Sequence, residues 1–152
     1  MLTKNHKNKI VLHDLDFEEK VSSSNLFLTV YGYVPCGTPN FIDDNVEGYL
    51  EIPKSMLGQG DFFVLRAKGD SMIDAGIKTG DLIIIKQQNY AEDGQVVVAL
   101  TEEGNTLKRL IWDNGRPRLH AENKAYSVQK QDIYPKQLTI QGIALKVIKD
   151  IS

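Results

Sequence analysis

The chain has 152 residues, with 18 Lys and Arg against 20 Asp and Glu and a formal charge of -2 at pH 7. Hydrophobic residues make up 41% of the chain and charged residues 25%, as in ordinary globular proteins. The length suits one domain with a tail and excludes a many-domain architecture. The slightly acidic balance argues against direct, specific DNA binding by this chain, because nucleic-acid binders usually carry a basic excess.

The single cysteine, Cys36, excludes an internal disulfide and fits a reducing compartment. The apolar run that follows the basic N-terminus, residues 10–12, is too short for a secretory signal. The longest uncharged stretch, residues 21–42, contains serines, glycines and prolines that could not cross a bilayer as a helix. We therefore expect a soluble, cytoplasmic protein with no membrane partner.

Residues 1–25 show no helical period and no capping signal, so they are expected to form an extension and not a helix-turn-helix DNA reader. From residue 26 onward, short runs rich in β-branched and aromatic residues alternate with turn residues, which is typical of strands. The predicted strands are residues 26–30, 62–65, 82–85, 95–100, 106–111 and 138–148.

Turn signals separate these runs. Glu102-Glu103-Gly104-Asn105 and Asp113-Asn114-Gly115 each predict a hairpin. Residues 53–57 predict one helical turn, with Pro53 at a tolerated early position. Together the runs and turns predict a mainly β fold: a compact, mostly antiparallel domain from about Tyr31 onward, preceded by a flexible N-terminal arm.

Ser71 is the first candidate catalytic residue. It follows a predicted strand and Gly69, so a tight turn could expose its hydroxyl beside backbone N–H groups able to stabilise an oxyanion. The alternative is a plain turn in which Ser71 caps a helix, since serine favours that position.

Lys108 is the second candidate. Strand alternation places Thr106, Lys108 and Leu110 on one face and Arg109 on the other, so one cation points toward the core whichever face is buried. Burial lowers the pKa of a lysine and yields a neutral amine that can act as a general base. Arginine cannot do this, because its pKa stays above ~12. The alternative is a lysine on an edge strand, or one whose stem snorkels along an apolar surface to solvent.

The segment around Cys36 and Gly37 is the third candidate. It lies in the uncharged stretch, and an extended, glycine-containing segment is what a protease cleft accepts by backbone pairing. The alternative is a simple connector. Cys36 could itself be a nucleophile, but no local sequence supports this; the candidate bases for that reading are His6, His13 and His120. The sequence offers no metal-ligand spacing, phosphate loop or dinucleotide fingerprint, so no metal and no cofactor are expected.

Together these elements resemble the self-cleaving serine peptidases of the LexA repressor and UmuD mutagenesis-protein family. Three motifs carry the resemblance in the family's order: the Cys36-Gly37 bond, the Gly69-Asp70-Ser71-Met72 turn and the Lys108-Arg109 strand. Residues 73–77, 80–82, 93–99 and 139–144 are similar as well, so the resemblance covers roughly residues 31–148. It implies a LexA-like peptidase domain, residues 37–152, behind an N-terminal arm, residues 1–36, that self-cleavage removes.

The resemblance also implies a mechanism. Ser71 attacks the carbonyl of Cys36, and neutral Lys108 takes the hydroxyl proton and delivers one to the leaving amine of Gly37. The other implied site residues are the backbone N–H groups of Asp70 and Ser71 as oxyanion donors and Val34 for seating the cleavage segment. The enzyme would thus be an autocatalytic serine endopeptidase with a Ser-Lys dyad.

The implied partners are a second copy of the chain and the RecA filament on single-stranded DNA, which would favour the docked arm. The 36 residues before the expected cut do not read as a winged helix-turn-helix domain, unlike the N-terminal part of LexA-type repressors. We therefore expect a UmuD-like accessory subunit of an error-prone translesion polymerase, activated by self-cleavage in the SOS response to DNA damage. Its further partner would be the polymerase catalytic subunit.

Two alternatives stay open. One is the C-terminal self-cleavage and dimerisation domain of a LexA-type or phage repressor, seen without its DNA-binding half. The other, from a different class, is a non-enzymatic dimerisation module with a vestigial dyad.

Overall fold

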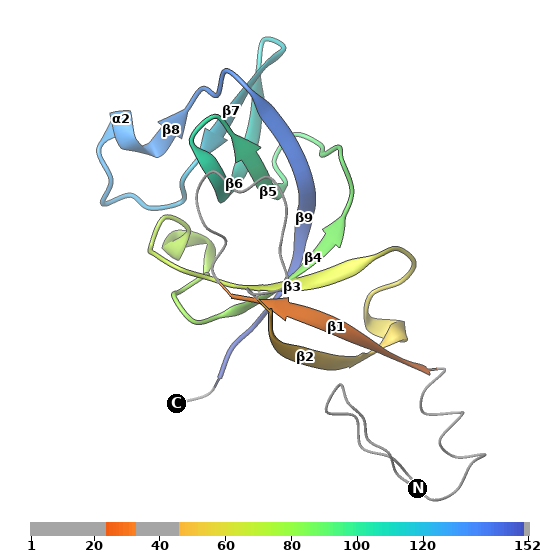
Figure 1. Cartoon of the computed structure of the whole chain (residues 1–152). Coiled ribbons are helices and arrows are strands. Elements are labelled where there is room, and N and C mark those ends of the chain that lie inside the picture. The colour runs from red at the N-terminus through yellow and green to blue at the C-terminus, as the bar shows by residue number, and fades with distance from the viewer. Residues whose placement is uncertain (1–23, 33–45, 151–152) are drawn as a thin grey trace, which may run out of the picture.

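The computed structural model of the chain describes residues 24–32 and 46–150, and in these residues nine strands form one sheet (Figure 1). The strand order is β2-β1-β3-β4-β9-β5-β6-β7-β8. The strands are β1 (Asn25–Tyr31), β2 (Val46–Pro53), β3 (Phe62–Arg66), β4 (Leu82–Gln87), β5 (Val96–Thr101), β6 (Gly104–Asp113), β7 (Arg116–His120), β8 (Asp132–Ile133) and β9 (Leu138–Ile148). The short helical segments are η2 (Lys54–Met56), η3 (Ile73–Ala75) and α2 (Val128–Gln131). The mainly β fold expected from the sequence is confirmed.

The strand pairs are antiparallel with one exception, β1 and β3, where Val30 pairs with Val64 and Tyr31 with Leu65 in parallel. β1 belongs to the N-terminal segment 1–36, yet it is a full member of the sheet. Its Leu28 and Val30 are buried, and burying such side chains contributes about 1.5–3 kcal/mol each. The sheet therefore begins ahead of the predicted start at Tyr31.

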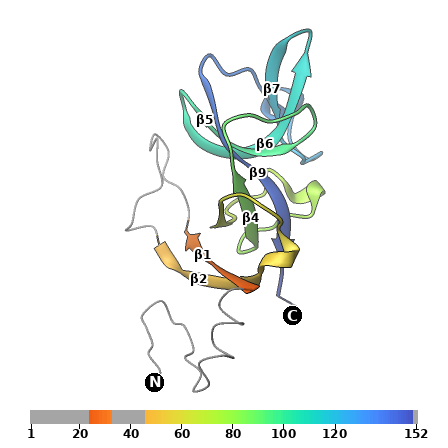
Figure 2. The ribbon, with the colours of Figure 1, turned by 90° about the vertical axis from the view of Figure 1, so that its right-hand side faces the viewer.

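The sheet consists of two groups of strands joined by β9. Figures 1 and 2 show β1–β4 in one group, β5–β8 in the other, and β9 running through both. β9 pairs with β4 along one stretch and with β5 along another. At Gly142 the backbones approach so closely that an added Cβ would meet the Ile85 side chain and the Lys86 carbonyl. The long strand thus fixes the two groups relative to each other.

The core consists of three hydrophobic clusters. One lies between the two groups, because it combines Val98 of β5 with residues of β3 and β4; it contains Phe63, Leu65, Ala67, Met72, Ile77, Ile83, Ile85 and Val98. The second belongs to the β1–β4 group and the third to the β5–β8 group and β9. Three consecutive isoleucines of β4, residues 83–85, are fully buried, so both faces of this strand are covered.

The strands that the sequence did not predict are β2, β7 and β8. β2 and β8 are the two edges of the sheet, where a strand needs only one apolar face. β2 contains Glu47, Gly48 and Glu51, and β7 contains Pro117, which are depleted in strands. Three turn predictions are confirmed. β5 and β6 pair antiparallel across the turn at Glu102 and Glu103, with Thr101 opposite Gly104. Asn114 and Gly115 have positive φ values of 51° and 78° between β6 and β7, and η2 follows Pro53.

Candidate active site

Ser71 lies on the turn that follows β3. The chain reverses at Gly69, whose φ of +89° suits glycine. The Thr79 side chain hydrogen-bonds both backbone polar groups of Gly69. Thr79 Oγ1 accepts a hydrogen bond from Gly69 N at 2.9 Å and donates one to Gly69 O at 3.0 Å. η3 begins two residues after Ser71, and its N-cap, Met72, makes no side-chain capping bond. Ser71 is therefore not the helix cap that the alternative interpretation requires.

Lys108 lies near the middle of β6 and reaches Ser71. Its Nζ is 3.2 Å from Ser71 Oγ and 2.6 Å from Thr106 Oγ1. The predicted sharing of one strand face by Thr106 and Lys108 is thus confirmed, and the buried Leu110 continues that face. Arg109 points the other way, where Nη1 donates to Gly94 O at 2.7 Å and Nη2 lies 3.3 Å from Glu122.

Burial lowers the pKa of the Lys108 ammonium, because the partly apolar surroundings disfavour its charged form. A larger fraction of neutral amine is therefore present at mildly alkaline pH than for an exposed lysine. A neutral amine within hydrogen-bond reach of a serine hydroxyl can accept its proton. The pair therefore has the geometry that a nucleophile and its base require.

The two side chains face a cleft of about 580 Å³ between the two groups of strands. Its lining is largely apolar and includes Leu65, Met72, Ile77, Ile83 and Val98. Gly32, the residue after β1, also lines it. An apolar cleft with two convergent polar groups is what an extended peptide substrate needs.

The expected cleavage residues Val34, Cys36 and Gly37 lie outside the described residues, as do His6 and His13. His120, one of the candidate bases for Cys36, lies on β7 and is not one of the described residues that line the cleft. Its Nδ1 is 2.8 Å from Asp132 Oδ1 and its Nε2 is 3.4 Å from Glu122 Oε2.

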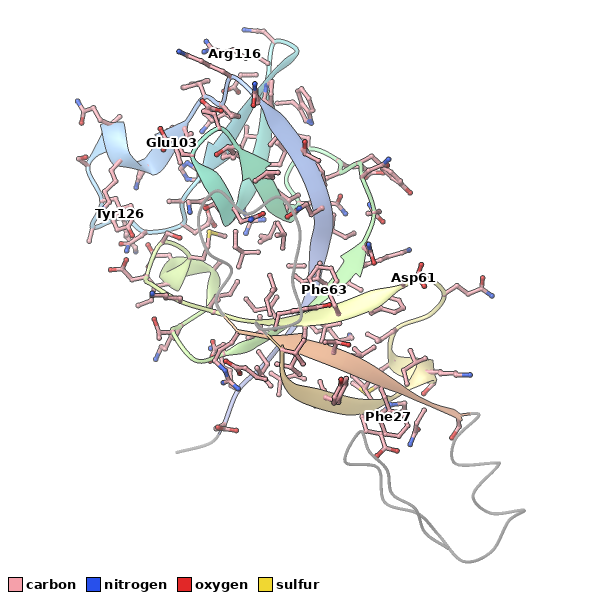
Figure 3. All side chains as sticks on the ribbon, viewed as in Figure 1. Phe27, Asp61, Phe63, Glu103, Arg116 and Tyr126 are labelled. Carbon is pink, nitrogen blue, oxygen red and sulfur yellow. The ribbon has the colours of Figure 1, made fainter. Side chains whose placement is uncertain are left out.

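Two residues that the sequence did not single out, Asn123 and Tyr126, form hydrogen bonds to Asp70 in the Ser71 turn. Asn123 Nδ2 donates to the Asp70 carbonyl at 2.9 Å, and Tyr126 Oη donates to Asp70 Oδ1 at 2.5 Å. Figure 3 shows Tyr126 on the segment between β7 and α2. Thr106 could have been found from strand alternation, whereas no local pattern marks Asn123 or Tyr126.

In the part of the chain that the structure describes, no group of three or more His, Cys, Asp and Glu side chains could hold a metal ion. None of its helices is long and apolar enough to cross a membrane.

A family model described as Peptidase S24-like matches residues 29–145, which include both Ser71 and Lys108. The chain belongs to this family. The expected membership in the LexA/UmuD-like group of self-cleaving peptidases is thereby confirmed.

Curated relatives include LexA repressors from several bacteria. The protein from Pelotomaculum thermopropionicum is 39% identical over 133 residues, which are 88% of this chain and 63% of the relative. The protein from Caldicellulosiruptor saccharolyticus is 41% identical over 80% of this chain and 58% of its own length. The protein from Shewanella amazonensis is 39% identical over 81% of this chain and 59% of its own length. The chain thus spans about three fifths of these relatives. Their names support the repressor alternative and give no support to the translesion polymerase role.

Proposed function

We propose that the chain is an autocatalytic serine endopeptidase domain that cuts its own Cys36-Gly37 bond, as the self-cleaving half of a LexA-type repressor. The observation that carries the proposal is the 3.2 Å approach of Lys108 Nζ to Ser71 Oγ, at a lysine whose pKa burial lowers. The names of the relatives favour the repressor setting over the polymerase subunit.

The proposed reaction proceeds in two stages. Ser71 Oγ attacks the carbonyl carbon of Cys36 while its proton moves to Lys108 Nζ, and the carbonyl oxygen becomes an oxyanion facing the backbone N–H groups of Asp70 and Ser71. The intermediate then collapses, the bond to the Gly37 nitrogen breaks, and the Lys108 ammonium gives that nitrogen its proton. Water, deprotonated by the again neutral Lys108, releases the Cys36 carboxylate from Ser71.

The position of Gly32 supports cleavage within one chain. Gly32 lines the cleft, and Cys36 is four residues further on, a span of up to ~14 Å in extended form. Tyr31 pairs with Val46, so the strand ends on either side of residues 33–45 lie next to each other. The proposal assigns residues 1–36 to the released segment and residues 37–152 to the peptidase domain, with Val34 seating the segment in the cleft.

The test is self-cleavage of the purified chain at mildly alkaline pH. Mass spectrometry under denaturing conditions should detect fragments 1–36 and 37–152; denaturation is needed because β1 pairs with β2 and β3 and would hold the two fragments together. Ser71→Ala and Lys108→Ala should remain intact, while the exposed controls Ser55→Ala and Lys136→Ala should cleave normally. An intact wild-type chain after long incubation with RecA filaments would contradict the proposal.

Two further measurements address the setting. Cleavage within one chain gives a first-order rate constant that does not change with protein concentration, and active chains leave added Ser71→Ala chains uncut. Specific operator binding by the native full-length protein would support the repressor setting, with dimerisation and the RecA filament as the associated partners. Co-purification with a translesion polymerase subunit would contradict it.

A further inference from the structure

Asn123 is the buried polar residue of the described part of the chain, with 6% of its surface exposed. Burying an amide is unfavourable unless its polar atoms find partners. Asn123 Oδ1 accepts from Ala125 N at 2.9 Å, and Nδ2 donates to the Asp70 carbonyl at 2.9 Å. The two partners fix the orientation of the amide, because Ala125 N can only donate and Asp70 O can only accept. Asn123 thus donates to one defined backbone oxygen.

That oxygen belongs to the peptide unit that joins Asp70 to Ser71. A trans peptide unit is planar, and its C=O and N–H point in opposite directions. A hydrogen bond that holds the Asp70 carbonyl therefore also sets the direction of the Ser71 N–H. Ile73 N donates to the same carbonyl at 3.2 Å from within the turn. The hydrogen bond from Asn123 restrains this carbonyl from outside the turn.

The segment that carries Asn123 is itself anchored to the lysine strand. Residues 121–126 follow β7 along the chain. β7 pairs with β6, and His120 at its end lies opposite Arg109, the residue after Lys108. Two further bonds join the segment to the Ser71 turn. Asp74 N donates to Glu122 O at 2.8 Å, and Lys124 N donates to Asp74 Oδ2 at 2.6 Å. The strand that carries Lys108 is therefore connected through β7 and Asn123 to the peptide unit between Asp70 and Ser71.

We propose that Asn123 is a positioning residue that holds the Asp70–Ser71 peptide unit with its N–H set to stabilise the oxyanion of the self-cleavage reaction. The inference rests on the proposed self-cleavage. Asn123 does not line the cleft among the described residues, so it acts through the turn and not by touching the substrate. A donated hydrogen bond to the carbonyl also polarises the amide and strengthens its N–H as a donor.

Two substitutions remove the donor in different ways. Asn123→Leu is neutral and close in size, whereas Asn123→Asp keeps an acceptor for Ala125 N. The matched controls Asn89→Leu and Asn89→Asp make the same changes at an exposed loop position. The readouts are the first-order rate of self-cleavage across pH and the thermal midpoint of each variant in a Ser71→Ala background. The plateau rate at high pH is compared first, because Lys108 is neutral there in every variant.

We expect the plateau rate to fall about 10- to 100-fold in both Asn123 variants, since loss of one oxyanion donor costs ~10²–10³-fold and a misdirected donor costs less. The pH of half-maximal rate, read on Asn123→Leu, should stay at the wild-type value because the surroundings of Lys108 are unchanged. If one variant does not fold, the plateau rate of the other decides.

An unchanged plateau rate would overturn the inference. A rate that falls only in step with the thermal midpoint would overturn it as well, because this means general loosening of the fold. A shifted pH of half-maximal rate in Asn123→Leu would also overturn it, because this means an effect through Lys108. These outcomes are distinct from failure of the proposed function, in which the wild-type chain stays intact or the Ser71→Ala chain is cut.

Discussion

Ser71 and Lys108 meet in one cleft, but the chain holds them in different ways. Lys108 is a strand residue: it pairs with Val97 of β5, and its neighbour Arg109 pairs with His120 of β7. Ser71 is a turn residue with no strand partner, and side chains such as Thr79 and Asn123 fix the turn around it. The proposed base is therefore fixed by the regular sheet, whereas the proposed nucleophile depends on separate contacts from distant segments. Substitutions at Lys108, at Thr106 and around the Ser71 turn test the two sides of this difference.

Lys108→Arg should have the largest effect on the lysine side. Arginine keeps the position and the charge, but its pKa above ~12 prevents it from taking a proton from Ser71. Self-cleavage measured by mass spectrometry should fall by at least ~10²–10⁴-fold, the usual contribution of a general base. Lys146→Arg, the same change at an exposed position of β9, is the control and should cleave at nearly the wild-type rate. Cleavage by Lys108→Arg within tenfold of wild type would mean that Lys108 is not the base.

Thr106→Val should have the next largest effect. Thr106 Oγ1 lies 2.6 Å from Lys108 Nζ and accepts a hydrogen bond that stabilises the ammonium. Without it, the pKa of Lys108 should fall further, so the pH of half-maximal rate moves to lower values. The plateau rate should fall about tenfold, since the amine loses a partner that orients it. The control is Thr139→Val at an exposed position of β9; a shift to higher pH in Thr106→Val would contradict the assignment.

Lys108→Met tests how burial of the proposed base affects the stability of the fold. Because the pKa of Lys108 is lower in the folded chain than in the unfolded chain, the unfolded chain binds more protons between the two values. Wild-type stability therefore rises with pH across this window and is lowest below the folded-state pKa. Methionine carries no charge, so Lys108→Met should raise the thermal midpoint by a few degrees near neutral pH. This gain in thermal midpoint should shrink as the pH rises toward the pKa of ordinary lysines, ~10.4.

The measurement is thermal unfolding of Ser71→Ala and Ser71→Ala/Lys108→Met chains across this pH range, in which the alanine prevents self-cleavage. Lys136→Met in the same background controls for loss of an exposed charge. A gain that is constant with pH would show that methionine acts by packing alone and not by removing a buried charge.

The same difference explains what the sequence could predict. The strands predicted at β1, β3, β4, β5, β6 and β9 are apolar runs rich in β-branched or aromatic residues, and alternation along β6 correctly placed Lys108 beside Thr106. Such signals are local, because strand geometry repeats every two residues. The proximity of Ser71 to Lys108, 37 residues apart, followed from family resemblance and not from any local pattern.

Asn123 could not be predicted in this way. It lies 53 residues from Asp70, and its role depends on how β7 leads the following segment back to the Ser71 turn. The edge strand β2 was missed because it keeps polar residues on one side and needs only one apolar face. Local patterns thus predict elements held by the sheet better than contacts made between distant turns.

Tyr126→Phe should have the smallest effect and tests which part of Asp70 matters. Tyr126 Oη donates to the Asp70 side chain at 2.5 Å, whereas Asn123 donates to the backbone carbonyl. The bond to Asp70 raises the pKa of Tyr126, so this hydroxyl stays protonated at the mildly alkaline pH used for cleavage. Because the side-chain bond does not set the direction of the Ser71 N–H, its loss should slow cleavage only about two- to threefold.

The control for Tyr126→Phe is Tyr134→Phe, which removes an exposed hydroxyl and keeps the ring beside Arg116. The measurement is the plateau rate of self-cleavage, determined alongside the Asn123 variants. A loss as large as theirs would mean that the Asp70 side chain, and not the Asp70–Ser71 peptide unit, is what positions the nucleophile. A small loss in Tyr126→Phe beside a large one in Asn123→Leu assigns the restraint to the peptide unit, the part of the turn that also carries the proposed oxyanion donor.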